Sequence, residues 1–163
     1  MKPVSNWIIS ALIMACLLLS VAGAQSEDVL ILVAAQGSRA KAQPWIDFLT
    51  KNQLDVEHYV LSELDQVKEE PYIAIMGGLD EPGIKELLTE VIGAEEVATL
   101  TPKGAKKMYL KTDVWKSGQK VLVFAGSDAG AAAEARVESK DTWMEHLTEW
   151  FDLEEVPGGL RAY

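Results

Sequence analysis

Cysteine is almost absent from this chain, which has Cys16 and no other. Because Cys16 lies in an apolar N-terminal segment, the rest of the sequence has no residue for a disulfide, a thiolate nucleophile or a zinc–thiolate site. Histidine is nearly as scarce, since His58 and His146 are the only two and neither stands in an H-E-x-x-H pattern. We therefore expect no metal centre and no cofactor.

Motifs for catalysis and phosphate binding are missing as well. The sequence contains no G-x-S-x-G, no G-x-G-x-x-G and no G-x-x-x-x-G-K-[ST]. Pairs of acidic residues such as Glu69-Glu70 and Glu95-Glu96 lie in polar stretches, which is typical of a solvated surface and not of a catalytic acid. The sequence predicts no catalytic residue, and we expect a protein that is not an enzyme.

Positive charge is limited, with 15 Lys and Arg against 25 Asp and Glu and a net charge of −10. Such an acidic chain is a poor partner for nucleic acid or anionic lipid, which would repel it. One basic cluster interrupts the acidic sequence and consists of Lys103, Lys106, Lys107, Lys111, Lys116 and Lys120. A charge run is commonly a solvated face, but patches of opposite sign on one domain also suit head-to-tail self-association.

The N-terminal segment 1–24 has the pattern of a signal peptide: Lys2, an apolar run over 7–21, and the small residues Ala22-Gly23-Ala24. Cleavage after Ala24 would give a secreted or cell-surface protein and shift the net charge from −10 to −11. Two alternatives stay open. The segment could be retained as an anchor, because the stretch 7–24, about 18 residues long, is just enough to cross a bilayer. Alternatively, Cys16 could carry a lipid. Membrane contact is expected only through a retained 1–24.

The remaining sequence alternates apolar runs with helical patterns, which predicts an α/β domain over 25–153 and a tail over 154–163. The fold class is a three-layer sandwich with a mostly parallel sheet of about five strands, flavodoxin-like or Rossmann-like. Strands are expected at 29–35, 55–61, 72–76 and 121–125, with an edge strand at 108–115. Helices are expected at about 39–52, 82–92 and 141–151, beside an alanine-rich segment after Asp128.

Local signals add detail to these elements. Ser38, Asp80 and Asp128 are predicted helix caps, Pro82 stands at a first helical turn, and Gly77 ends the third strand. Tryptophans are expected in two settings. Those in the core are Trp45, Trp143 and Trp150, whereas Trp115 ends the edge strand half-exposed, where it could meet a neighbouring subunit or a glycan.

Three strands end in glycine-containing turns that each lead into a helix. In a parallel sheet these ends lie along one edge, where free N–H groups favour an anion. This gives a candidate ligand crevice formed by Gly37, Ser38, Gly77, Gly78, Gly126 and Ser127. The alternative is structural, with glycines permitting the turns and polar residues capping the helices.

The units 72–80 (YIAIMGGLD) and 120–133 (KVLVFAGSDAGAAA) carry a family resemblance. Together they resemble paired strand–turn–helix units of archaeal S-layer and related cell-envelope proteins, over about 70–135. Leu79 stands where that family has proline, and Ala131 or Ala132 where it often has threonine. The resemblance implies a structural protein that assembles into, or decorates, an envelope lattice or filament, with copies of itself or other envelope proteins as partners. A binding domain for a small ligand or glycan at the glycine turns is the alternative.

Overall fold

The computed structural model describes residues 29–156 and 159–162. The predicted signal peptide at 1–24 and the residue Cys16 lie outside these residues. Within the described part of the chain, no helix is both long enough and apolar enough to cross a membrane.

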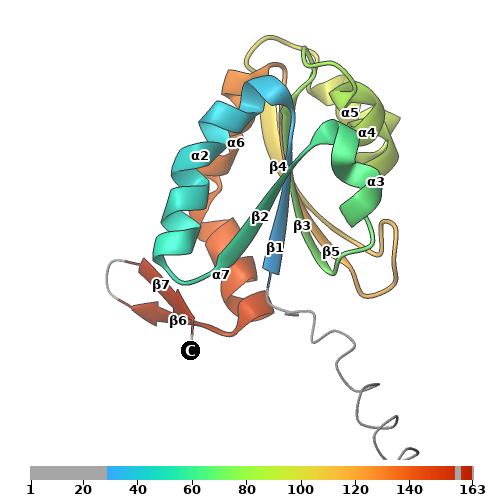
Figure 1. The fold of residues 1–163 in the computed structure, drawn as a ribbon. Helices are drawn as coiled ribbons and strands as arrows, with labels where there is room; N and C mark the ends of the chain where they lie inside the picture. The colour runs from blue at the N-terminus through green and yellow to red at the C-terminus, as the bar shows by residue number, and fades with distance from the viewer. Residues whose placement is uncertain (1–28, 157–158, 163) are drawn as a thin grey trace, which may run out of the picture.

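A five-stranded sheet forms the centre of the domain, in the order β2-β1-β3-β5-β4 (Figure 1). Four neighbouring strands are parallel, and β4 pairs antiparallel with β5 at one edge. This confirms the mostly parallel sheet and the edge strand. The strands are β1 (Val29–Ala34), β2 (Asp55–Val60), β3 (Tyr72–Gly78), β4 (Lys106–Thr112) and β5 (Lys120–Gly126).

Helices cover both faces of the sheet and complete the predicted three layers (Figure 1). One face carries α2 (Gln36–Lys51), α6 (Ala129–Glu138) and α7 (Lys140–Phe151). The other face carries α3 (Leu64–Val67), α4 (Ile84–Ile92) and α5 (Ala94–Thr99), with the short helix η1 (Leu61–Glu63) before α3. At the C-terminal end, β6 (Leu153–Val156) and β7 (Gly159–Ala162) form an antiparallel hairpin that begins one residue before the expected tail.

The sheet separates two hydrophobic cores, because successive side chains of a strand point to opposite faces. Leu32 and Phe124 lie in the core under α2, α6 and α7, whereas Ile75 and Val123 lie in the core under α4 and α5. The central strands are therefore buried on both sides, as their continuous apolar sequences predicted. The predicted core tryptophans Trp45, Trp143 and Trp150 are 1%, 2% and 8% exposed.

Some boundaries and caps differ from the prediction. Helix α2 begins at Gln36, so Ser38 lies in its first turn and is not its cap. Helix α4 begins at Ile84 after the left-handed Gly83, so neither Asp80 nor Pro82 occupies the predicted position. Strand β3 continues through Gly77 and Gly78, because both pair with β5. Only the cap of α6 is as predicted, with Asp128 accepting from the Ala131 N–H at 2.9 Å.

Candidate functional site

The three glycine-containing strand ends lie next to one another, since β1, β3 and β5 are neighbours in the sheet. Gly78 is the register partner of Gly126. Backbone bonds continue this alignment past the strands, from Ala35 N–H to the Met76 carbonyl and from Leu79 N–H to the Gly126 carbonyl. The six residues of the candidate crevice thus belong to three adjacent chain segments.

An internal carboxylate occupies the N-terminal end of α2. Glu81 is only 8% exposed. Its Oε1 accepts from the Ser38 N–H at 2.8 Å, and its Oε2 accepts from the Ser38 hydroxyl at 2.5 Å and the Gly78 N–H at 2.9 Å. A negative charge at a helix N-terminus is favourable because free N–H groups point toward it. Glu81 therefore takes the position that an anionic ligand would take in an open sheet of this kind.

The glycines of these turns permit close packing. A Cβ on Gly37 would lie 2.8 Å from Glu81 Oε1, and one on Gly126 would lie 2.5 Å from the Ala132 nitrogen. A Cβ on Gly77 would collide with the Ile84 side chain, and one on Gly78 with the backbone at Asp128. Each glycine thus allows a helix or a carboxylate to approach the strand end.

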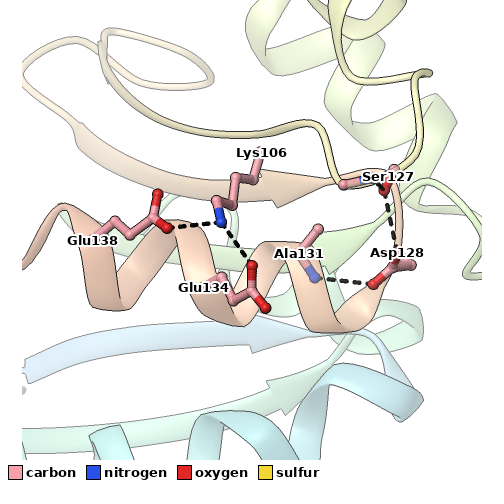
Figure 2. Close-up of polar contacts among 7 residues, drawn as sticks. Lys106, Ser127, Asp128, Ala131, Glu134 and Glu138 are labelled. Carbon is pink, nitrogen blue, oxygen red and sulfur yellow. Dashed lines mark hydrogen bonds and ion pairs between the residues drawn. The ribbon is translucent and has the colours of Figure 1, made fainter.

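Ser127 connects two loops at the end of β5. Its hydroxyl accepts from the Gly104 N–H at 2.9 Å and donates to the Asp128 carboxylate at 3.2 Å (Figure 2). Asp128 in turn caps α6, and this hydrogen bond from Ala131 lowers the pKa of the Asp128 carboxyl below its ordinary value. Ser127 and Asp128 therefore hold the loop before β4 against the start of α6.

An open crevice of about 760 Å³ lies beside Glu81, at the carboxyl ends of β1, β2 and β3. Of the six predicted crevice residues it includes Gly37, but not Ser38 or the four residues at the ends of β3 and β5. Its polar lining comes mainly from Gln36, Arg39, Ser62, Asp80 and Glu81. The crevice is therefore lined by charges of both signs.

Glu81 was expected only to add negative charge beside these turns, and its hydrogen bonds to Ser38 and Gly78 were not predicted. The sequence offered one signal, an acidic residue three positions after Gly78. That signal was ambiguous because Asp80 is equally close, and Ser38 lies 43 positions away from Glu81.

Neither histidine lines the crevice beside Glu81. His58 is half-buried in β2, and burial lowers the pKa of its imidazole, with a smaller contribution from the nearby Arg39 cation. His146 stacks on the Trp150 ring at 6.0 Å between centroids. In the part of the chain that the structure describes, no three His, Cys, Asp or Glu residues are grouped to hold a metal ion.

The lysine cluster divides into paired and unpaired members. Lys106 Nζ lies 2.7 Å from both Glu134 and Glu138 of α6 (Figure 2), and Lys107 Nζ lies 3.0 Å from Glu96. These hydrogen bonds raise the pKa of both lysines. Lys120 is 4.0 Å from Glu149. Among residues 29–153, no carboxylate lies within 4.0 Å of the remaining members, Lys103, Lys111 and Lys116.

The two edges of the sheet have opposite charge on the same face. Strand register places Lys107 and Lys111 of β4 beside Ala125 and Val121, which point into the core under α4 and α5. On the other edge, Glu57 and Asp55 of β2 are register partners of Ile31 and Val29, which contact the same core. The basic residues of one edge and the acidic residues of the other therefore lie on one side of the sheet.

Trp115 lies just beyond the basic edge. It is half-buried against the core under α4 and α5, and its indole N–H donates to Glu90 at 2.6 Å. Leu110 of β4 is instead 39% exposed, so it is the apolar side chain that this edge presents to solvent.

Comparisons of the chain with protein-family models, with curated proteins and with solved structures found no match. The resemblance to envelope proteins consequently stays a prediction from two short motifs. In the structure these motifs form the adjacent strands β3 and β5 with their following turns.

Proposed function

We propose that this chain is an exported, non-enzymatic cell-envelope protein that assembles head to tail through the edges of its sheet. The observation that carries the proposal is the opposite charge of the two edges on one face of the sheet. Asp55 and Glu57 of β2 would meet Lys107 and Lys111 of β4 in the next copy. A contact between two different surfaces of one protein adds copies without limit unless the copies close into a ring. Growth of this kind is what a lattice or filament requires.

Strand direction supports such a contact. Among the residues that the structure describes, each edge strand is paired on one side only. Apart from the Val60 N–H, which donates to Glu63, outward N–H and C=O groups are therefore available for another strand. Strand β4 runs antiparallel to β5, and β5 is parallel to β3, β1 and β2. A second copy placed in the same orientation would therefore present its β2 antiparallel to β4, which is the stronger of the two pairing geometries.

Side chains on the edges favour the same arrangement. Lys111 has no carboxylate partner among residues 29–153, whereas Lys107 already pairs with the half-buried Glu96 at 3.0 Å. Opposite charges on neighbouring strands stabilise a pair by about 0.2–1 kcal/mol, whereas like charges destabilise it. Leu110 adds an exposed apolar surface at the same edge. The contact would be sensitive to salt because its charges are solvent-exposed.

A charge swap tests the proposal directly. Lys111→Glu and Glu57→Lys each place like charges across the junction, so each variant alone should associate about tenfold more weakly than the unmodified protein. An equimolar mixture should assemble again, because the carboxylate introduced at position 111 of one variant meets the ammonium introduced at position 57 of the other. The second kind of junction in the mixture keeps its native charges. Sedimentation velocity over a concentration series measures the association.

Two matched controls change the same charges away from the edges. They are Lys41→Glu, at an exposed position of α2, and Glu86→Lys, at an exposed position of α4. Both should leave association unchanged. A monomer at all concentrations, or equal effects of edge and control variants, would show that the edges do not mediate assembly.

Two finer features belong to the same proposal. The four parallel strands follow the order second, first, third, fourth, which is the order at the start of a flavodoxin-like sheet. We also propose export through cleavage of 1–24, which the pattern of Lys2 and Ala22-Gly23-Ala24 supports. Intact mass spectrometry of the protein from its native cells should give a mass that begins at Gln25.

The crevice beside Glu81 favours a second candidate function, which is binding of a small polar ligand. Its volume of about 760 Å³ lies within the range of small-molecule sites. Because Glu81 already accepts the N–H groups of Ser38 and Gly78, such a ligand would interact with Arg39 and Asp80 instead. If the crevice binds such a ligand, added sugars or amino acids should raise the thermal midpoint of the unmodified protein. The midpoint of Arg39→Met should not rise.

A further inference from the structure

A small pocket of about 210 Å³ lies on the α2, α6 and α7 side of the domain, and none of the residues of the glycine turns lines it. Helix α2 contributes Trp45 and Phe48, the end of α6 contributes Arg136 and Val137, and α7 contributes Lys140 and Trp143. The residues that form the edge contact do not take part in this pocket. A ligand could therefore occupy this pocket without involving the sheet edges.

Three aromatic rings give the pocket an apolar wall with fixed geometry. Trp143 meets Trp45 edge-on with centroids 5.4 Å apart, and it meets Phe48 in the same way at 6.1 Å. Trp45 and Trp143 are almost fully buried, so their ring positions are held by the core. At the rim, Val137 is 61% exposed, which leaves apolar surface open to solvent. A flat apolar group would pack favourably against these rings.

The same pocket carries two positive charges. The Arg136 Nε is buried and has no hydrogen-bond partner among the described residues, and no carboxylate in 29–153 lies within 4.0 Å of its guanidinium. Burial lowers the pKa of Arg136. Lys140 Nζ lies 5.6 Å from the centre of the Phe48 ring. A partly buried guanidinium without an opposing carboxylate is costly, and a bound anion would offset that cost.

The volume limits which anions fit. A cavity of about 150 Å³ in another protein accommodates benzene, so about 210 Å³ accommodates one aromatic ring with a short substituent. We propose that this pocket binds a small aromatic carboxylate, with its ring against Phe48 and Trp143 and its carboxylate at Arg136 and Lys140. The cations would pair with the carboxylate of such a ligand, and the aromatic side chains would pack against its ring.

Phenylacetate and its neutral analogue phenylacetamide test the proposal, since they differ in charge but hardly in shape. Titration followed by tryptophan fluorescence or calorimetry should show saturable binding of phenylacetate, with phenylacetamide at least about tenfold weaker. Arg136→Met keeps a long side chain but removes the charge, and it should abolish the preference for phenylacetate. Lys140→Met should reduce the preference without affecting folding, because Lys140 is exposed.

Lys85→Met serves as the control, because Lys85 is exposed on α4, on the opposite face of the sheet, and takes part in neither the pocket nor the edge contact. It should bind phenylacetate as the unmodified protein does. Equal binding of phenylacetate and phenylacetamide would show an apolar pocket without anion recognition and would overturn the proposal, as would no binding of phenylacetate at about 10 mM. Either result leaves the edge-contact experiment unaffected, so the two proposals fail separately.

Discussion

At the scale of single residues, Glu81 connects the end of β3 to the start of α2 through its hydrogen bonds to Gly78 and Ser38. Replacing it with alanine would leave the N–H groups of Ser38 and Gly78 and the Ser38 hydroxyl without their acceptor. Because buried donors that lose a charged acceptor are costly, we expect Glu81→Ala to reduce the free energy of unfolding by about 3 kcal/mol. Urea denaturation measures the change.

Glu86→Ala is the matched control for this prediction, because Glu86 is exposed on the neighbouring helix. It should alter the free energy of unfolding by less than about 0.5 kcal/mol. Glu81→Gln should fall between the two, since an amide retains one acceptor oxygen but turns an NH₂ group toward another donor. Equal stability of the Glu81 and Glu86 variants would show that the buried carboxylate does not stabilise this edge.

Asp128 provides a residue-scale prediction with a defined pH dependence. The hydrogen bond from Ala131 holds its pKa below the ordinary value of 3.8, so the cap favours the ionised form in the folded protein. A carboxyl whose pKa is lower in the folded than in the unfolded state stabilises the folded protein when the pH is above the unfolded-state pKa. This stabilisation is lost as the pH falls through the folded-state pKa. Asp128→Ala should therefore lower the thermal midpoint at pH 7, and the difference from the unmodified protein should narrow toward pH 2.

Asp128→Asn is the informative comparison, because it keeps a capping oxygen but does not ionise. Its midpoint should change less with pH than that of the unmodified protein. A constant difference between Asp128→Ala and the unmodified protein from pH 7 to pH 2 would mean that ionisation of Asp128 plays no part in the cap.

At the scale of elements, β3 approaches the start of α6 closely at Gly78. A Cβ on Gly78 would collide with the Asp128 backbone, which cannot rotate away as a side chain can. We therefore expect Gly78→Ala to destabilise the domain by about 3 kcal/mol or more. Gly104→Ala is the control, because its Cβ would meet nothing within 4 Å and only the positive φ of 76° opposes it, at a cost of about 1–2 kcal/mol. Similar losses in both variants would contradict the packing argument.

The elements that could be predicted from sequence are those whose signal is local. Continuous apolar runs identified β1, β3 and β5 because both faces of these strands are buried. Helix α5 was missed because it has six residues and one buried apolar side chain, Val97, which is too little for a periodic pattern. The direction of β4 could not be derived, because side-chain alternation is the same in parallel and antiparallel strands.

At the scale of the whole molecule, the acidic composition and the lysine cluster were visible in the sequence, but their arrangement was not. Which face a lysine occupies depends on strand register, and a shift of one residue would move Lys107 and Lys111 to the opposite side. The same holds for Arg136, whose position beside Trp143 depends on how α6 and α7 pack. Both proposals therefore depend on three-dimensional placement that no local pattern encodes.

The twist of the sheet determines the form that an edge-to-edge assembly would take. Neighbouring strands rotate by roughly 20–25°, so one copy of a five-stranded sheet turns its successor by about 110°. Five strand spacings of about 4.8 Å advance the next copy by about 24 Å. A continuous edge-to-edge sheet should accordingly form a helical filament with about three copies per turn, and not a flat lattice.

Electron microscopy of assembled protein measures both quantities, since helical reconstruction gives the rise and the rotation per copy. Agreement with a rise near 24 Å would require backbone pairing between β4 and β2, because contact through side chains alone would separate the copies further. A planar array, or a rise well above about 30 Å, would place the subunit contact elsewhere on the surface. The Lys111→Glu and Glu57→Lys mixture should give the same symmetry as the unmodified protein, because alternating the charges across a junction leaves the strand spacing unchanged.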